Sequence, residues 1–209
     1  MPRVSKAQTE LNYRRILEVT AARIREAGVD KVSVPEVMAA AGLTHGGFYR
    51  HFASKDDLVA RATAVAFAQR EEEYQAAVDG HSQGLGADGE TRREETYRAY
   101  LEGYVSEFHR DNPGTGCPAA ALAFDAAHVE RDTSDLKGAY VDGVRRMVDN
   151  LEKLATDGKD VAQDRQRALV DLATMVGAIT LARATAHDGL SNEILTAVRG
   201  SLLDARPTS

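Results

Sequence analysis

Six histidines and one cysteine are the first candidates in this sequence for metal binding or nucleophilic chemistry. The histidines are His45, His51, His81, His109, His128 and His187. No two of them have the His-x-x-x-His spacing that places two metal ligands on one helix face. Cys117 has no partner base evident in the sequence, and neither a phosphate-binding glycine loop nor a nucleophile elbow occurs. We therefore expect no enzyme activity, no metal site and no cofactor.

Polar residues that suit helix starts gather near the N-terminus instead. Ser33, Thr44 and Ser54 each precede a short helical pattern, and a hydroxyl at that place can accept a hydrogen bond from a free backbone N–H. Glu36 and Asp57 follow the two serines at the spacing of a capping box. The sequence therefore predicts a series of short, capped helices in this region.

Glycines separate these helices from one another. We expect a first helix over Ala7–Ala27 that ends at Gly28, and a short second helix that stops at Gly42. A third helix would follow from His45 to about Phe52. Two short helices joined by a tight turn that contains glycine form a helix-turn-helix, which predicts an N-terminal three-helix, DNA-binding domain over residues 1–58.

Charge and composition agree with such a domain on a larger body. The chain has 209 residues and a net charge of −6. Residues 1–61 hold ten Lys/Arg against seven Asp/Glu, whereas the remainder holds sixteen against twenty-five, so a basic head can approach phosphate locally. No apolar run approaches membrane-spanning length and no apolar signal region opens the chain, which predicts a cytoplasmic protein without membrane contact. A single cysteine fits a reducing compartment.

The rest of the chain is predicted to be helical as well. Expected helices cover Lys55–Val78, Thr91–Arg110, Pro118–Glu130, Ser134–Ala155, Asp160–His187 and Ser191 to about Ala205. A glycine-rich loop over Asp79–Gly89 would separate the first two, and no segment reads as a strand. The predicted fold is all-α with about nine helices, in which residues 59–209 form a C-terminal helical domain.

The stretch from Val32 to Leu58 resembles the DNA-binding signature of the tetracycline-repressor (TetR) family. The matching elements are Gly42, Thr44, Gly46, the cluster Tyr49-x-His51-Phe52, and Lys55 before Leu58. Ile16 to Gly28 resembles the first helix of the family. The remaining residues match only in the number and length of their helices.

The resemblance implies that the helix after Gly42 lies in the major groove of operator DNA with its N-terminal end against base edges. The DNA-binding residues that it implies are Ser33, Thr44, His45, Gly46, Tyr49, Arg50, His51 and Lys55. Gly47 departs from the small side chain more usual there, so the operator sequence does not follow. Alternatively, Ser33 and Thr44 act only as caps and Tyr49 packs inward, while Phe48 and Phe52 are expected in the core.

An aromatic stripe marks the C-terminal body. Tyr97, Tyr100, Tyr104 and Phe108 follow one another at helical spacing and would share one face. Plain core packing is one interpretation, and a pocket for a small apolar or aromatic effector is the other. The residues predicted to line that pocket are Phe67, Tyr97, Tyr100, Tyr104, Phe108, Cys117, Leu122, Phe124, Tyr140, Met147 and Met175. The effector remains unidentified.

A second pattern predicts a homodimer. Ala168, Leu172, Met175, Ile179, Ala182 and Ala186 recur at intervals of four and three residues, and Leu195, Val198 and Leu202 give the last helix a similar face. Packing within one chain is the alternative. The resemblance suggests instead that these helices form a four-helix interface between two chains, and that residues 59–209 are a ligand-binding and dimerisation domain. Two heads would then read a palindrome.

These features predict a ligand-responsive transcriptional regulator, a repressor that its effector releases from DNA. Three alternatives stay open: a repressor that senses electrophiles or oxidants through Cys117, a DNA-binding adaptor without an effector, and an activator. The other interpretation of Cys117 is an inert buried residue, the commoner state of a free cysteine.

Overall fold

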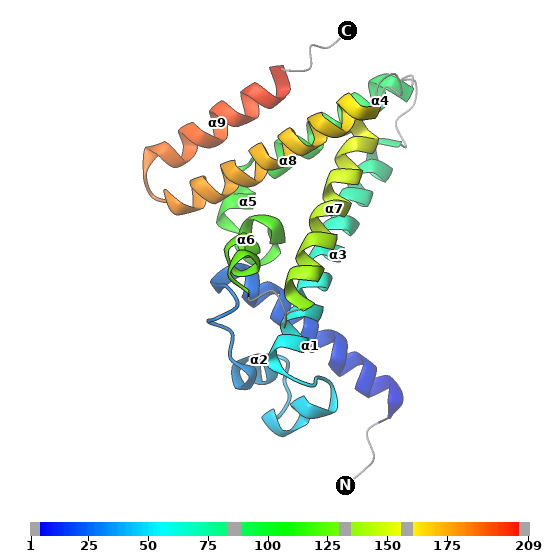
Figure 1. Cartoon of the computed structure of the whole chain (residues 1–209), viewed down its shortest axis with the longest axis vertical. Helices are drawn as coiled ribbons and strands as arrows, with labels where there is room; N and C mark the ends of the chain where they lie inside the picture. Colours follow the sequence, from blue (N-terminus) through cyan, green and yellow to red (C-terminus); the bar gives the residue numbers. More distant parts are fainter. Residues whose placement is uncertain (1–4, 83–88, 130–134, 156–160, 205–209) are drawn as a thin grey trace. The chain divides into compact units, whose positions relative to one another are not determined.

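The computed structural model describes residues 5–82, 89–129, 135–155 and 161–204, and it is helical throughout them (Figure 1). The α-helices are α1 (Lys6–Ala27), α2 (Val34–Ala40), α3 (Lys55–Ser82), α4 (Gly89–Tyr104), α5 (Glu107–Asp111), α6 (Pro118–His128), α7 (Asp135–Ala155), α8 (Val161–Ala184) and α9 (Gly189–Asp204), and two 3-10 helices are η1 (His45–Arg50) and η2 (Pro113–Thr115). None of the described residues lies in a strand, which confirms the predicted all-α class. Within the same residues, no helix combines the length and apolarity needed to span a membrane.

The chain divides into two compact units, each built from two stretches of sequence. Unit 1 comprises residues 1–68 and 113–142, and unit 2 comprises residues 69–112 and 143–209. This division differs from the predicted boundary after residue 58, because α6 and the start of α7 belong to the unit that holds the N-terminal helices. The division into a DNA-binding part and a ligand-binding part stays a prediction.

Local signals explain the ends of α1 and α2. Ser5 caps α1 by accepting a hydrogen bond from the backbone N–H of Gln8 at 3.1 Å. Gly28 ends this helix with a φ of 81°, a left-handed conformation that favours glycine. Ser33 stands at the N-cap position of α2, yet its hydroxyl makes no capping hydrogen bond, so the predicted capping box with Glu36 is absent. Its backbone carbonyl still accepts the first helical bond, from Val37 N–H at 3.0 Å.

The core of unit 1 joins the first helices to α3 and α6. Apolar side chains of α1 and α2 meet Phe48, Phe52 and the buried face of α3, and Leu122 of α6 closes the cluster. The Phe48 and Phe52 rings stack with centroids 5.6 Å apart, which confirms both as core residues. Tyr13 stacks on Phe52 at 5.3 Å, so α1 is tied to the segment that follows η1.

Unit 2 differs from the sequence prediction at the aromatic stripe. The helix predicted over Thr91–Arg110 ends at Tyr104, and Ser106 opens the separate helix α5 by accepting a hydrogen bond from His109 N–H at 3.1 Å. Tyr97 and Tyr104 are buried, whereas Phe108 is 73% exposed. Two members of the stripe are therefore buried and Tyr100 is half-buried, and the placement of Phe108 with them is wrong because the chain changes direction between α4 and α5.

Other predicted boundaries shift by a few residues. Helix α3 continues past Val78 to Ser82, α4 begins at Gly89, and α8 ends at Ala184 rather than His187. The central part of the predicted glycine loop lies outside the described residues, as do Glu130, Ser134, Asp160 and Ala205.

Helices α8 and α9 lie side by side in unit 2 (Figure 1). Five of the six residues of the predicted seam on α8 are buried within the single chain, and only Ala186 is exposed. Leu195 and Leu202 of α9 are buried too, and Val198 is half-buried. The seam therefore packs inside one protomer and offers little surface to a second one.

A buried histidine joins α4, α5 and α8. The Nδ1 of His109 donates to the Tyr104 carbonyl at 2.7 Å, and the ring meets Tyr104 edge-on at 4.5 Å. Arg183 of α8 donates to the His109 carbonyl at 2.8 Å. Burial lowers the pKa of His109 to about 4, and the positive charges of Arg70 and Arg183 act in the same direction.

We expect this histidine to make unit 2 sensitive to acid. The unfolded chain takes up the proton near the ordinary histidine pKa of about 6.5, while the folded chain resists it down to about 4. Between these values the unfolded state binds more protons, so the free energy of unfolding falls as the pH falls, by about 3 kcal/mol in total. Chemical denaturation at pH 7 and pH 4 measures this loss. In His109→Gln the difference between the two pH values should shrink by a similar amount, and an undiminished difference would assign the acid sensitivity to other groups.

Candidate DNA interface

The turn between α2 and η1 fixes the orientation of the helix-turn-helix. Gly42 adopts a φ of 75°, and Leu43 N–H donates to the Met38 carbonyl at 2.8 Å across the turn. The Arg15 guanidinium from α1 lies beside this glycine, 3.7 Å from where its Cβ would stand. A left-handed residue is required here, which explains the glycine that the sequence places at this turn.

Helix η1 separates an inner from an outer face. Phe48 is 2% exposed and packs in the core, whereas the neighbouring Tyr49 is 74% exposed. Thr44, His45, Gly46 and Arg50 are also exposed. The inward packing considered for Tyr49 is thus wrong, since its ring only touches Phe48 edge-on at 5.2 Å. One aromatic anchors the helix while its neighbour is presented to solvent.

The remaining predicted DNA-binding residues flank η1. His51 is half-buried with its ring centroid 6.3 Å from that of Tyr13, and Lys55 is half-buried in the first turn of α3. Ser33 is half-buried at the start of α2. Neither Ser33 nor Thr44 uses its hydroxyl as a helix cap, so the interpretation of these two residues as caps alone is not supported.

The start of α3 is held firmly. Ser54 Oγ accepts a hydrogen bond from Asp57 N–H at 3.0 Å, and Asp57 accepts another from Ala53 N–H at 3.0 Å, close to the predicted capping box. Arg61 pairs with Asp57, which lowers the pKa of that carboxyl, and donates to the Tyr13 hydroxyl at 3.1 Å. Lys55 is therefore carried by a helix end that is anchored to α1.

Arg15 is a candidate that sequence reasoning missed. It is exposed on α1, and its guanidinium lies at the Gly42 turn of the helix-turn-helix. A guanidinium in this place can bind a phosphate. The available signal was the pair Arg14–Arg15, but sequence alone does not show which residue of the pair reaches the turn.

The residues predicted for an effector pocket divide between the two units. Unit 1 holds Phe67, Cys117, Leu122, Phe124 and Tyr140, and unit 2 holds Tyr97, Tyr100, Tyr104, Phe108, Met147 and Met175. In unit 1, Phe67 and Tyr140 meet edge-on at 5.8 Å, Leu122 belongs to the core, and Phe124 is exposed. In unit 2, the buried Tyr97 donates its hydroxyl hydrogen bond to the carboxylate of Asp171.

Cys117 lies at the N-cap of α6, next to Pro118, and is fully buried. We expect the native thiol to react with a bulky disulfide reagent at least about 100-fold more slowly than the thiol of the unfolded chain, because reaction requires local opening. The measurement is the rate of thiol release, with an exposed thiol introduced as Ser201→Cys in a Cys117→Ser background for comparison. Native reactivity as fast as that of the surface thiol would contradict the buried position.

Comparisons with known proteins agree with this description. Residues 16–62 match the family model of bacterial regulatory proteins, tetR family. No curated protein matches the chain. The match covers the second half of α1, then α2, η1 and the first residues of α3, which are the elements described above.

Solved structures extend the likeness to the whole chain. The reduced form of NemR from E. coli has a TM-score of 0.72 at 18% identity, over 94% of this chain and 98% of that one. A TetR transcriptional regulator from Chloroflexus aurantiacus has a TM-score of 0.72 at 22% identity, over 95% of each chain. The fatty acid degradation regulator FadR from Bacillus halodurans has a TM-score of 0.62 at 15% identity, over 91% of this chain and 94% of that one.

These identities establish a shared fold, while the family match rests on the helix-turn-helix itself. Members of the matched family are transcription regulators and not enzymes. This agrees with the expectation, drawn from the spacing of the histidines and from the lone cysteine, that this chain is not an enzyme. Residues 16–62 therefore carry the DNA-binding region of the tetR family of bacterial regulatory proteins, and the chain shares the fold of solved TetR transcriptional regulators.

Proposed function

We propose that this regulator binds a palindromic DNA operator as a homodimer and that a small apolar or aromatic effector releases it. The observation that carries the proposal is the outer face of η1. Tyr49, His45 and Arg50 project from a short helix whose inner residue Phe48 is locked in the core. A rigid helix that presents aromatic and basic groups next to a tight turn suits the major groove and its phosphates.

Gly46 and the hydroxyl groups of Ser33 and Thr44 support the proposed contact with DNA. A Cβ at Gly46 would meet nothing within 4 Å, so packing does not require a glycine there. A glycine that the fold does not need is consistent with a close approach of the DNA backbone. Ser33 and Thr44 stand at helix starts with hydroxyls that make no capping bond, and each can donate to a phosphate oxygen.

The dimer proposal moves to the outer face of α8. Val170 and Leu181 are each 56% exposed, and they share one helix face with Ala173, Gly177 and Ala184 at spacings of three and four residues. Side chains at Ala173 and Ala184 are exposed, and a Cβ at Gly177 would meet nothing. An exposed apolar stripe with small residues permits close packing against the same stripe of a second copy.

The effector proposal rests on the inner face of α4. Tyr100 is half-buried between two other tyrosines, with ring centroids 5.7 Å from Tyr74 and 6.2 Å from Tyr104. Aromatic rings with a few polar groups are the usual lining of a site for an aromatic ligand. We expect Tyr97, Tyr100, Tyr104, Met147 and Met175 of unit 2 to contribute to it.

Selection of bound fragments from a library of random DNA duplexes tests the function. We expect enrichment of an inverted repeat whose half-sites are spaced for two heads, and an affinity that falls steeply with salt. Compounds that raise the melting temperature of the protein are then tested for release of the selected duplex. Recovery of duplexes without a common sequence would contradict a specific operator, and a screen without any stabilising, releasing compound would contradict the effector.

A further inference from the structure

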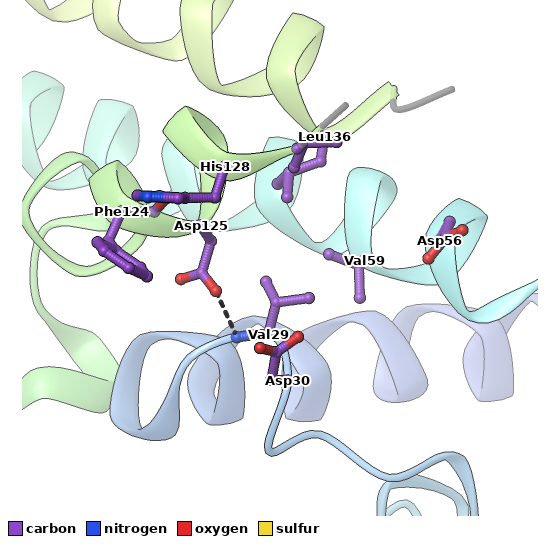
Figure 2. Close-up of a pocket in the computed structure, with 9 residues that line it drawn as sticks. Val29, Asp30, Asp56, Val59, Phe124, Asp125, His128 and Leu136 are labelled. Atoms are coloured by element: carbon purple, nitrogen blue, oxygen red, sulfur yellow. Dashed lines mark hydrogen bonds between the residues drawn. The ribbon is translucent and has the colours of Figure 1, made fainter. Parts of the chain in front are cut away.

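A pocket of about 310 Å³ lies within unit 1, and none of the residues that line it is predicted to contact DNA (Figure 2). Its walls come from the connection after α1, from the start of α3, from the end of α6 and from the start of α7. The volume is at the lower end of the range for small-molecule sites.

Carboxylates give this pocket its charge. Asp30, Asp56 and Asp125 line it, and none of its lining residues is a lysine or an arginine. Asp30 and Asp56 are exposed on the rim, whereas Asp125 is half-buried and accepts a hydrogen bond from Val29 N–H at 3.2 Å (Figure 2). The pocket therefore favours a positively charged occupant.

The other walls are apolar and aromatic. Phe124 is 73% exposed, and its ring lies against His128 with centroids 3.9 Å apart. His128 Nδ1 donates to the Phe124 carbonyl at 2.8 Å, which holds the two rings together. Val59 and Leu136 are buried beside them. An exposed aromatic face next to carboxylates binds cations through the ring as well as through charge.

We propose that this pocket binds a small organic cation with an apolar body. The carboxylates would face the ammonium group, and Phe124 with the buried aliphatic side chains would cover the hydrocarbon part. A bare metal ion is a poor occupant, because among the described residues no three His, Cys, Asp or Glu side chains come together closely enough to hold one. An extended organic cation, by contrast, can interact with carboxylates that lie apart from one another.

The position of the pocket links this ligand to DNA binding. The pocket includes Val29, which follows α1, Val59 of α3, and residues of α6. Helices α1 and α3 flank the helix-turn-helix segment α2–η1 in the chain. The hydrogen bond from Val29 to Asp125 already joins the end of α1 to α6. A cation that binds Asp125 competes with the Val29 N–H for this carboxylate. It would thereby change the contact between α6 and the end of α1. This regulatory consequence rests on the proposed function, whereas the binding of the cation does not.

The test uses full-length protein and three probes of one shape: 4-phenylbutylamine, 4-phenylbutanol and 4-phenylbutanoate. Ligand-observed NMR titrations at pH 7 and constant ionic strength report their affinities. We expect about millimolar binding of the amine, and binding of the alcohol and the carboxylate at least about tenfold weaker. The double variant Asp30→Asn/Asp56→Asn should weaken the amine at least about fivefold, Phe124→Ala about threefold or more, and the control Glu18→Gln, an exposed carboxylate of α1 outside the pocket, not at all.

Equal binding of the three probes would overturn the charge argument, and equal amine binding by all variants would overturn the assignment to this pocket. Loss of amine binding in millimolar magnesium chloride, but not in sodium chloride of equal ionic strength, would replace the organic cation by a metal ion. Operator affinity is then measured with and without the amine in the parent protein and in the double variant. Binding of the amine without a change in operator affinity would overturn the regulatory consequence and leave the proposed function intact.

Discussion

Tyr49→Ala is expected to fold as stably as the parent protein and to bind operator DNA about tenfold or more weakly. The side chain is 74% exposed, so its removal opens no cavity. The hydroxyl stands on the outer face of η1, where a hydrogen bond to a charged phosphate contributes about 1.5–3 kcal/mol. Fluorescence anisotropy at a fixed salt concentration measures the loss of affinity, and thermal unfolding measures stability.

The neighbouring residue provides the matched control. Phe48→Ala removes a ring that is 2% exposed and stacked on Phe52, so we expect the free energy of unfolding to fall by about 3–5 kcal/mol. Operator binding would then be lost together with the fold.

Lys55→Ala is expected to keep the fold and to weaken operator binding. The number of counterions released on binding, which is measured from the salt dependence of the affinity, should fall by about one. Unchanged affinity in both Tyr49→Ala and Lys55→Ala would remove η1 and the start of α3 from the DNA interface.

The helix-turn-helix was predictable because its signals are local. The glycine of the Gly42 turn, the hydroxyl of Ser54 and the aromatic pair Phe48–Phe52 each determine the conformation of a few neighbouring residues. Even so, sequence alone left open the direction of Tyr49, because a tyrosine suits both a core and a phosphate. The structure decides this through the packing of its neighbour Phe48.

Helix α8 shows why sequence alone did not locate the proposed dimer surface. The buried seam through Leu172 and Ile179 and the exposed stripe through Val170 and Leu181 have the same apolar, small-residue spacing on opposite faces. Periodicity identifies each face but does not say which one the same chain covers. That choice depends on tertiary packing, in which α9 lies against α8.

The break before α5 and the pocket of unit 1 were missed for a related reason. The apolar spacing continues through Tyr104 to Phe108, so the cap at Ser106 was hidden within a regular pattern. The pocket is formed by four separate segments, and no single segment carries a recognisable motif. Both features follow from tertiary contacts rather than from local preference.

Substitution of Leu181 by aspartate is expected to convert the proposed dimer into monomers. In a symmetric interface each substitution occurs twice, so two carboxylates would face an apolar surface or each other without a partner. The side chain is 56% exposed in the single chain, so the monomer should keep its fold. Sedimentation velocity at several protein concentrations measures the change in mass, and circular dichroism measures the retained helix content.

The same variant separates the contribution of dimerisation to operator affinity from the contribution of the helix-turn-helix. Two linked heads bind a palindrome with an effective concentration that a monomer lacks, so we expect operator affinity to fall at least about 100-fold although η1 is unaltered. Val141→Asp on α7 is the control, because it places the same charge at an exposed apolar residue of a different helix. If Leu181→Asp remained dimeric while Val141→Asp dissociated, the interface would have to lie on α7. If neither variant dissociated, the exposed stripe of α8 would not be the dimer surface, and the spacing of its small residues would need another explanation.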